Sequence, residues 1–592
     1  MITLGYNGFS QSAELFAKLY QRSGIDRHRV LGHDAGAALF IDGELVAAVE
    51  EERLNRTKKT SDFPERAVAW CLAEAGIKFS DVDRFAFPWA FTEEVVDCQL
   101  RAAAESDKPV AVRFDELRRL GELYRQLVSR DAILADFRQR TGYGLPAERL
   151  VLVPHHHAHL MCGYHLSDWE DAAFLVSDGR AELLSSIAGE IRDGKITVFD
   201  DMCVDIKNSL AMLYSKVTRY LGFMPNNDEY KVMGLSAYAS VEPTSNPLLE
   251  HVITLHEGGR YSLNFTNDLL DRQTYYDMFD RIFNRDSTTD EQEFRTTVAR
   301  FVQQAVEVVT EHQLRHLEAR TRLPRLLLEG GLALNCVNNS KLLERSTFTD
   351  IEVGFGASDV GVAIGAGAAA SGRRPTRGRT TPYLGPSYSD QEILDAVRPF
   401  SDRVSWTVLG EHEMVAETAK LLRDKVVVGW FQDRVEYGPR ALGNRSILAN
   451  PSFPDIKDVI NTRVKHRELF RPFAPVVRDT RAAQVFDMGK KTTSPHMTFV
   501  FAVREHVRAS IVGACHVDGT ARVQTVSSQD NPMLAALLDV FEEQTGIPCL
   551  INTSFNVAGE PIVCSPADAL RTFLDTEIDY LVLGHLLVSK QA

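Results

Sequence analysis

The same local unit occurs twice in the first 200 residues, and this repeat limits the folds that the chain can adopt. Each unit has one apolar run followed by two apolar runs that an Asp-Gly dipeptide joins. The runs are residues 2–6, 37–41 and 45–49 in the first unit, and 173–177, 186–191 and 196–199 in the second. Asp-Gly between two apolar runs is the strongest short signal for a β-hairpin. The sequence therefore predicts two halves that each begin with a strand and a hairpin.

Two halves of this kind are typical of an actin-like ATPase or a sugar kinase, which holds a nucleotide between them. Asp-Gly hairpins are common, so a chance likeness of the two units is the alternative. Apolar residues at helical spacing predict helices over 64–76 and 295–317, and an apolar run predicts a buried strand at 325–329. Strands that alternate with long helices favour an α/β fold for this part of the chain.

A segment rich in Gly, Pro and Arg, residues 371–382, lacks any hydrophobic periodicity and is typical of a surface linker. We therefore predict a first domain over 1–370, a linker over 371–388 and a second domain over 389–592. Apolar runs at 426–431 and 548–552 predict strands of the second domain.

The bulk composition excludes several classes of function. The 592 residues carry a formal net charge of -15, which argues against nucleic acid as the main partner. No run approaches the roughly 20 apolar residues of a membrane span, and the N-terminus lacks a secretory signal. The eight cysteines are scattered without a Cys-x-x-Cys pair, so we expect neither a zinc knuckle nor disulfides. We expect a cytoplasmic protein that acts on a small molecule, with no nucleic acid and no membrane partner.

The sequence suggests a metal site. His155 and His159 are four residues apart, which places both imidazoles on one face of a helix. Asp178 and Asp359 each follow an apolar run, where ligands bind in open α/β sheets. Two imidazoles and two carboxylates favour a divalent ion such as iron, manganese or zinc over calcium. A polar helix start with surface histidines is the alternative.

Three further features are weaker signals for chemistry. His33 lies in a Gly- and Ala-rich turn and has the pKa range of a general base, although such a histidine is more often structural. Gly330-Gly331 follows a strand and could offer backbone N–H groups to a phosphate, but such a pair is more often a plain structural turn. Lys58 ends a charged run that is either a solvated face or a contact to an anion.

The second domain concentrates basic residues between glycines, prolines and aromatic residues. They are Arg440, Arg445, Arg463, Lys465, Arg467, Arg471 and Arg522. Guanidinium groups on rigid loops suit a phosphate-bearing ligand. Ordinary surface charge is the alternative, although interleaved Phe470 and Phe473 imply partial burial. The residues alone leave the two interpretations about equal.

Taken together, the motifs resemble those of the NodU/CmcH family of O-carbamoyltransferases, which includes the tobramycin carbamoyltransferase. Nine ordered motifs carry the resemblance from the N-terminus to the C-terminus. They are residues 33–38, 50–56, 155–159, 231–235, 329–335, 358–361, 437–446, 471–475 and 552–556. The resemblance implies an N-terminal actin-like domain of the duplicated, ribonuclease H-like type and a C-terminal YrdC-like domain, an α/β and α+β fold overall.

The resemblance also implies a reaction in two steps. The YrdC-like domain forms carbamoyl-adenylate from carbamoyl phosphate and ATP with magnesium. The actin-like domain then transfers the carbamoyl group to a hydroxyl of a small natural product. The family alternative is a threonylcarbamoyl-adenosine type of tRNA modification, which the acidic net charge disfavours. The alternative from another class is a non-catalytic nucleotide-binding regulator. The sequence leaves a homodimer open.

The resemblance assigns roles to particular residues. His155, His159, Asp178 and Asp359 would hold the metal, with iron expected and manganese or zinc as alternatives. His33 would be the base, and Lys58 would contact the carbamoyl-adenylate. The residues expected at carbamoyl phosphate are Arg440, Lys465, Arg471, Arg522, Asn552 and Ser554. The residues expected at the nucleotide, with Asp178, are Lys231, Gly330, Gly331 and Asn335.

The chain departs from the family pattern in two places. After Asp178 the family usually has two glycines one residue apart, whereas this chain has Gly179-Arg180-Ala181. Arg180 could crowd the nucleotide or pair with its phosphate. Residues 9–30 form a segment longer than in the shortest relatives. Because it precedes His33, we expect it to form part of the acceptor pocket.

Overall fold

The computed structural model describes residues 1–239, 244–264, 272–285, 290–372 and 380–591. The chain divides into two compact units. The first comprises 1–52, 59–338 and 345–379, and the second comprises 53–58, 339–344 and 380–592. Two short segments that the sequence-based boundaries assign to the first domain thus group with the second unit. Residues 373–379 of the predicted linker lie outside the described residues.

The first half of unit 1 is a five-stranded sheet with the order β3-β2-β1-β4-β5. Its strands are β1 (Ile2–Asn7), β2 (Gly36–Ile41), β3 (Glu44–Glu50), β4 (Arg84–Phe87) and β5 (Leu150–Leu152). β2 is antiparallel to β1 and β3, whereas β4 is parallel to β1 and β5 is parallel to β4. Asp42 and Gly43 have φ values of 52° and 89°, as a two-residue type I′ hairpin requires.

The second half repeats this order as β8-β7-β6-β12-β13, with β9 paired to β7. The strands are β6 (Ala172–Ser177), β7 (Leu184–Arg192), β8 (Lys195–Val198), β9 (Val204–Asp205), β12 (Arg325–Glu329) and β13 (Asp350–Glu352). β6 begins an antiparallel hairpin and then pairs with parallel β12, as β1 does with β4. The predicted duplication is confirmed, and unit 1 has the duplicated, ribonuclease H-like arrangement of the actin-like fold.

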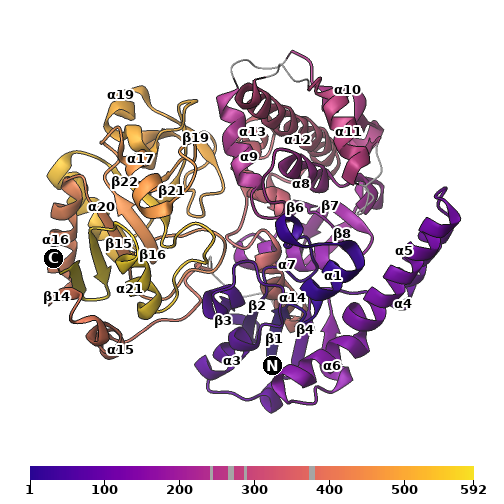
Figure 1. Ribbon diagram of the computed structural model, residues 1–592, viewed down its shortest axis with the longest axis horizontal. Coiled ribbons are helices and arrows are strands. Elements are labelled where there is room, and N and C mark those ends of the chain that lie inside the picture. The colour runs from indigo at the N-terminus through magenta and orange to yellow at the C-terminus, as the bar shows by residue number, and fades with distance from the viewer. Residues whose placement is uncertain (240–243, 265–271, 286–289, 373–379, 592) are drawn as a thin grey trace. The chain divides into compact units, whose positions relative to one another are not determined.

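Two helices join the two sheets of unit 1 (Figure 1). α14 (Val362–Ser371) packs on β1, β2 and β4, while α7 (His155–Leu166) packs on β6 and β12. The helices also pack against each other, with Ala158 and Ala366 in one apolar cluster. Small residues permit this close approach. A Cβ at Gly365 would lie 1.7 Å from the carbonyl oxygen of Ala158, so only glycine fits there.

We expect Gly365→Ala to destabilise unit 1 by about 3 kcal/mol or more, because the added methyl meets backbone and no side chain can move aside. Thermal unfolding followed by circular dichroism measures the effect. Gly121→Ala in α5 (Val110–Leu123) is the matched control, since nothing lies within 4 Å of its added Cβ. That change should leave stability unchanged or raise it by about 0.5–1 kcal/mol. Equal midpoints for the two variants would contradict the close helix contact.

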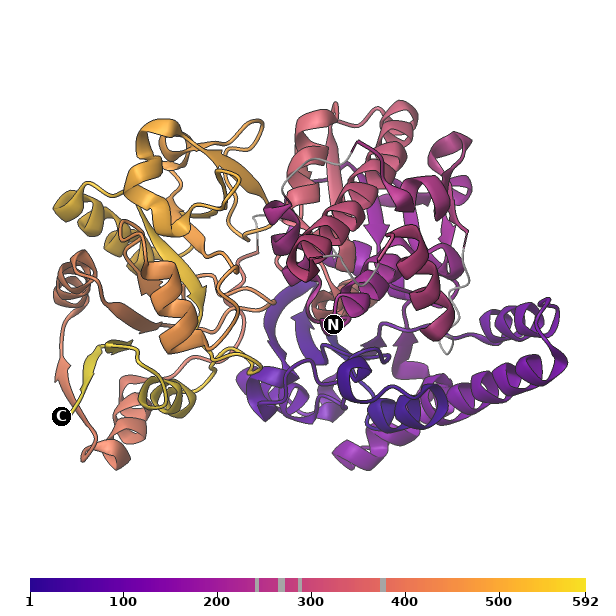
Figure 2. The ribbon, with the colours of Figure 1, turned by 45° about the horizontal axis from the view of Figure 1, so that its top comes forward.

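Further helices and a small hairpin complete unit 1. α4 and α5 pack side by side as a helical hairpin (Figure 2). The predicted helices over 64–76 and 295–317 are confirmed as α3 and α12. The elements are α1 (Ser12–Tyr20), α2 (Glu51–Asn55), α3 (Glu65–Glu74), α4 (Glu93–Ala104), α6 (Arg130–Thr141), α8 (Leu210–Tyr220), α9 (Glu229–Leu235), α10 (Pro247–His251), β10 (Ile253–Leu255), β11 (Tyr261–Leu263), α11 (Arg272–Ile282), α12 (Glu291–Thr321) and α13 (Cys336–Arg345).

Unit 2 is built on a mixed eight-stranded sheet with the order β14-β24-β23-β15-β16-β22-β17-β21. The strands are β14 (Val404–Val408), β15 (Val427–Phe431), β16 (Arg445–Ala449), β17 (Ala474–Arg478), β21 (Gln524–Val526), β22 (Cys549–Ser554), β23 (Tyr580–Leu583) and β24 (Leu586–Lys590). β15 and β22 confirm the two strands predicted for this part of the chain. A small sheet, β18-β19-β20, comprises Phe486–Asp487, Val500–Val503 and Thr520–Arg522.

Helices cover both faces of the large sheet. Apolar residues of α15 (Asp390–Val397) and α21 (Pro566–Leu574) form a core on one face. Those of α16 (Glu411–Arg423) and α20 (Pro532–Thr545) form a core on the other. Short helices α17 (Ile456–Val459), α18 (Ala482–Val485) and α19 (Glu505–Arg508) complete the unit. This helix-covered mixed sheet fits the YrdC-like architecture that the motifs imply. In the described part of the chain, no helix has the length and apolar composition to cross a membrane.

Candidate functional site

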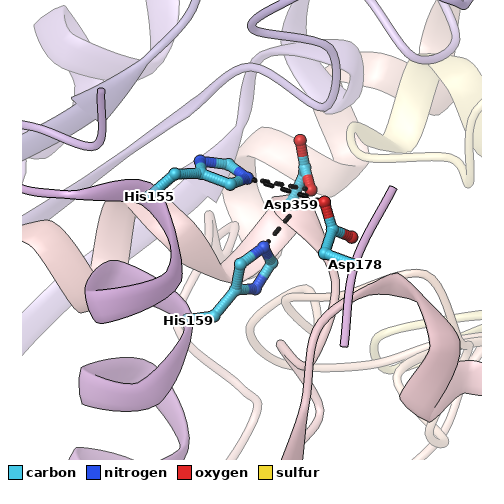
Figure 3. A group of neighbouring side chains, drawn as sticks. All are labelled: His155, His159, Asp178 and Asp359. Carbon is cyan, nitrogen blue, oxygen red and sulfur yellow. Dashed lines mark ion pairs between the residues drawn. The ribbon is translucent and has the colours of Figure 1, made fainter. Parts of the chain in front are cut away.

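Four buried side chains of unit 1 converge on one point (Figure 3). The ligand atoms of His155, His159, Asp178 and Asp359 all lie within 4.8 Å of one another. The Nε2 atoms of His155 and His159 lie 3.6 and 3.4 Å from Oδ1 of Asp359. Nε2 of His155 also lies 3.8 Å from Oδ2 of Asp178. The structure thus brings together the four residues that the sequence suggested as metal ligands.

The duplicated fold explains why these residues meet. His155 and His159 occupy the first turns of α7, and Asp178 directly follows β6. Asp359 begins the short 3-10 helix that precedes α14. Because α7 and α14 pack against each other, the start of each helix lies beside the end of β6. One helix pair and one strand end therefore position all four side chains.

The residues fit a divalent metal ion. Among the residues that the structure describes, Nε2 of His155 and Nε2 of His159 are buried and have no hydrogen-bond partner. Nδ1 of His155 donates to the carbonyl oxygen of Pro88 at 3.1 Å, which leaves the Nε2 lone pair facing the cluster. Buried polar atoms are normally satisfied. Two orphaned imidazole nitrogens beside two carboxylates therefore form a donor set that suits a divalent cation.

His33 borders this cluster through Asp359. Nε2 of His33 lies 3.5 Å from Oδ2 of Asp359, whose other oxygen faces the two histidines of α7. On its other side, Nδ1 of His33 hydrogen bonds to Asp34 at 2.9 Å, and Nζ of Lys59 lies 3.0 Å from the same carboxylate oxygen. Asp34 adopts the left-handed conformation with a φ of 58°. The Asp34 carboxylate thus fixes the imidazole between the lysine and the cluster.

The electrostatics of this group follow from burial and close ion pairs. Burial alone would lower the pKa of His33, but the Asp359 and Asp34 carboxylates outweigh it and raise that pKa. Burial disfavours ionised Asp359, yet His33 and His155 hold its pKa well below the ordinary value. Lys59 and His33 likewise lower the pKa of Asp34 despite burial. Both carboxylates are therefore ionised at neutral pH.

We expect Asp34→Asn to lower the rate of the reaction that uses His33 by about tenfold to a hundredfold. Asparagine tolerates a positive φ, so the backbone should hold while the negative charge beside His33 is lost. Rates of the purified variant at saturating substrates measure the effect. Asp62→Asn is the control, because Asp62 contacts Thr60 and not His33. A rate loss equal in both variants would show a general change in this loop instead.

Unit 2 contains a second, basic site. Nζ of Lys465 contacts oxygens of Ser554 and Asn556, at 3.2 Å from Oγ of Ser554 and 2.9 Å from Oδ1 of Asn556. Burial lowers the pKa of Lys465 well below its usual value, and the charges of Arg467 and Lys58 add to the effect. Lys58 belongs to the segment 53–58 that groups with unit 2. It therefore lies near this basic site.

Arg467 and Arg522, at the same site, are close enough for their charges to interact. Burial lowers the pKa of Arg467 to about 10, and the charge of Arg522 contributes. Asn552 is 1% exposed; its amide donates to Oε1 of Gln524, and its Oδ1 has no hydrogen-bond partner in the described part of the chain. Arg471 is 8% exposed and lies 3.4 Å from Glu468. Arg467 and Arg471 lie near Glu468, and together with Arg522 they still leave an excess of positive charge, which suits a phosphate-bearing ligand.

Comparison with known proteins identifies the family. Residues 22–368 match the family described as Carbamoyltransferase N-terminus, and residues 419–590 match Carbamoyltransferase C-terminus. The chain belongs to the carbamoyltransferases. Nodulation protein NolNO of Sinorhizobium fredii is 35% identical over 606 residues, covering 100% of this chain and 83% of that protein. These matches confirm the NodU/CmcH type.

Two other similarities cover less of the chain or have a lower sequence identity. The 3'-hydroxymethylcephem-O-carbamoyltransferase of Streptomyces clavuligerus is 36% identical over 271 residues, 45% of this chain and 49% of that protein. The solved structure of a ROK hexokinase from Thermus thermophilus covers 62% of this chain and 98% of that chain, at 14% identity and a TM-score of 0.27. The strand order of unit 1, and not this low similarity, establishes the fold.

The carbamoyltransferase site contains residues that the motifs did not predict. The Trp89 ring stacks on the His155 ring, with centroids 3.8 Å apart. Nε1 of Trp89 donates to Asn7 at 3.3 Å, and the amide of Asn7 donates to the carbonyl oxygen of His33 at 3.1 Å. The Glu182 carboxylate accepts from the backbone N–H of His155 at 3.1 Å, at the N-terminus of α7. The only signals available in the sequence were a polar residue, Asn7, at the end of β1 and a tryptophan, Trp89, shortly after β4.

The structure gives the predicted nucleotide residues local partners. The N–H of Gly331 donates to Oδ1 of Asp178 at 2.8 Å, and the N–H of Gly330 donates to the carbonyl oxygen of Ala357 at 2.8 Å. We had expected these amides to bind a phosphate. Instead, both already donate to protein oxygens and so position Asp178 and the turn. Asn335 hydrogen bonds with Gln303 at 2.9 Å, and Nζ of Lys231 lies 3.0 Å from Asp228.

The glycine of this turn is required by its surroundings. Gly330 has a φ of 88°, and a Cβ there would lie 2.3 Å from the carbonyl oxygen of Ser177. The strand carrying Asp178 can therefore approach the turn closely.

Of the remaining predicted residues in unit 2, Arg440 is partly buried in the loop between β15 and β16.

Proposed function

We propose that this carbamoyltransferase is an ATP-dependent O-carbamoyltransferase that modifies a hydroxyl of a small natural product. In the first step, carbamoyl phosphate, water and ATP give carbamoyl-adenylate, pyrophosphate and phosphate. In the second, the acceptor oxygen attacks the carbamoyl carbon, the bond to AMP breaks, and the hydroxyl proton passes to a base. The printed name of the S. clavuligerus relative, an O-carbamoyltransferase, supports the choice of oxygen as the acceptor atom.

The basic site of unit 2 suits the first step. Carbamoyl phosphate is a small dianion, and buried guanidinium groups bind such groups through charge-assisted hydrogen bonds. Arg467 and Arg522 lie close enough to affect each other's charge, and Arg440, Arg471 and Asn552 belong to neighbouring loops and strands of the same unit. Lys465 holds Ser554 and Asn556 and so stabilises the end of β22. We therefore assign Lys465 a positioning role, in which it holds Ser554 and Asn556 in place.

The His33 group of unit 1 suits the second step. A base must lie within hydrogen-bond reach of the proton that it takes, and Nε2 of His33 lies at the edge of the cluster, 3.5 Å from Oδ2 of Asp359. Asp34 fixes the ring and would stabilise the imidazolium after proton transfer. A divalent metal held by His155, His159, Asp178 and Asp359 would offset negative charge on the departing phosphate. Iron is the ion that we expect there, with manganese or zinc as alternatives.

One observation carries this proposal: a histidine held by a carboxylate lies against a buried His₂Asp₂ cluster in a carbamoyltransferase. The test uses the full-length protein with ATP, magnesium and labelled carbamoyl phosphate. We expect pyrophosphate release that requires both co-substrates, and AMP release with a labelled carbamate ester when a suitable alcohol is added. If label appears in an amine or in tRNA, or if pyrophosphate forms without carbamoyl phosphate, the proposal fails.

A further inference from the structure

The segment expected to border the acceptor pocket lies beside Arg180. Residues 9–30 contain α1 and a 3-10 turn over Gly24–Asp26. Tyr20, the last residue of α1, is close enough to Arg180 for the two groups to influence each other electrostatically. The backbone N–H of Arg180 donates to Oδ2 of Asp178 at 3.3 Å. Arg180 therefore connects the His₂Asp₂ cluster to the start of the chain.

The guanidinium of Arg180 lacks the partners that such a group normally has. It makes no hydrogen bond or ion pair with any residue that the structure describes, and its Nε is buried without a partner. Glu182 is the acid nearby, but its carboxylate already accepts from the N–H groups of Ala90 at 2.7 Å and His155 at 3.1 Å. A buried guanidinium nitrogen without an acceptor is costly, unless a ligand supplies the acceptor.

Further arginines lie along the same segment. The guanidinium of Arg119 lies over the Tyr20 ring, 5.7 Å from its centroid, and also pairs with Asp115. Further along the segment, Asp26 is shared by three arginines, with Arg219 at 3.0 Å, Arg29 at 3.5 Å and Arg22 at 3.9 Å. Arg29 is 7% exposed, and its Nη2 has no hydrogen-bond partner in the described ranges. Three guanidinium groups thus share the single carboxylate of Asp26 in this segment.

We propose that the acceptor carries an anionic group, a carboxylate or a sulfate or phosphate ester, and that Arg180 binds it. This rests on the proposed function, since it specifies the substrate of that same site. A planar guanidinium binds each of these groups through two parallel hydrogen bonds. Anchored beside Asp178 and against α1, the anion would hold the acceptor hydroxyl near His33 and the cluster. Arg180 is then a specificity residue for the transfer step.

The competing occupant is the phosphate of the nucleotide. One observation favours the acceptor: the Arg180 side chain lies near Tyr20 of α1, in the segment that is long in this chain. If Arg180 instead held the nucleotide, its loss would weaken AMP binding directly.

The test is a selenate soak of crystals of the full-length protein grown with AMP, with selenium located by its anomalous signal. We expect a selenate at hydrogen-bond distance from the Arg180 guanidinium in the wild type. We expect that peak to be lost in Arg180→Gln and kept in Arg101→Gln, a control on an exposed arginine of α4. Calorimetric titration should give AMP dissociation constants that differ by less than about twofold between wild type and Arg180→Gln.

Each other outcome overturns the inference. A wild-type map without selenate at Arg180 shows that no anion site exists there. A loss of AMP affinity of about tenfold or more in Arg180→Gln assigns the side chain to the nucleotide. Pyrophosphate release from carbamoyl phosphate and ATP, measured in the same proteins, tests the proposed function separately.

Discussion

His159→Ala is expected to remove the bound metal and to reduce carbamoyl transfer by about a hundredfold or more, while carbamoyl-adenylate still forms. A metal beside a departing phosphate lowers the activation barrier by several kcal/mol, so its removal should slow transfer by this factor. The variant removes one of two buried imidazoles that face Asp359, at 3.4 Å. Metal content by mass spectrometry and AMP release with acceptor measure the two effects, and pyrophosphate release measures the first step.

His157→Ala is the matched control, because His157 lies on the same helix but outside the cluster. It should keep both metal and transfer. Asp359→Asn should behave as His159→Ala does, and it should also change the surroundings of His33. A His159→Ala protein that retains the ion and full transfer would show that the four side chains do not form a metal site. Loss of metal with full transfer would make the ion structural.

Arg522→Gln is expected to weaken carbamoyl phosphate binding by about tenfold to a hundredfold without lowering the stability of the unliganded protein. A charge-assisted hydrogen bond contributes about 1.5–3 kcal/mol to binding. The charge of Arg522 contributes to the lowered pKa of Arg467. Removing one of these two like charges therefore relieves the electrostatic repulsion between them. The Michaelis constant for carbamoyl phosphate in pyrophosphate release measures binding, and the midpoint of thermal unfolding measures stability.

Arg463→Gln provides the comparison, because Arg463 is exposed and pairs with Glu577 at the surface of the same unit. Neither its Michaelis constant nor its stability should change appreciably. Carbamoyl phosphate should raise the unfolding midpoint of the wild type more than that of Arg522→Gln. A variant that is less stable but binds carbamoyl phosphate normally would make Arg522 a structural residue, and the first step would need another site.

Local sequence patterns predicted the framework of unit 1 because short-range rules govern them. Asp-Gly turns fix hairpin geometry through two positive φ values. Residues four positions apart on a helix share one face, as His155 and His159 do. Asp178 ends a strand, a position that opens toward ligands in α/β sheets. Each of these inferences needs only residues that are close in sequence, and the structure bears them out.

Contacts between distant segments could not be read in this way. Trp89 and His155 stack although 66 positions separate them. Glu182 completes the N-terminus of α7 from outside the helix. The turn at Gly330 and Gly331 matched a phosphate-binding pattern, but its amides hold Asp178 and the Ala357 carbonyl. Which acceptor an N–H group finds depends on what the fold places opposite it.

The order of residues alone determined that the chain has two hairpin-led halves, two histidines on one helix face and a local concentration of basic residues in the second domain. Tertiary structure decided what those groups do together. It placed Asp359 between His33 and the α7 histidines, brought the charges of Arg467 and Arg522 close enough to interact, and grouped residues 53–58 and 339–344 with unit 2. The physical reason is that a periodic pattern fixes the direction of a side chain within its own element, whereas distances between elements follow from the packing of helices and sheets.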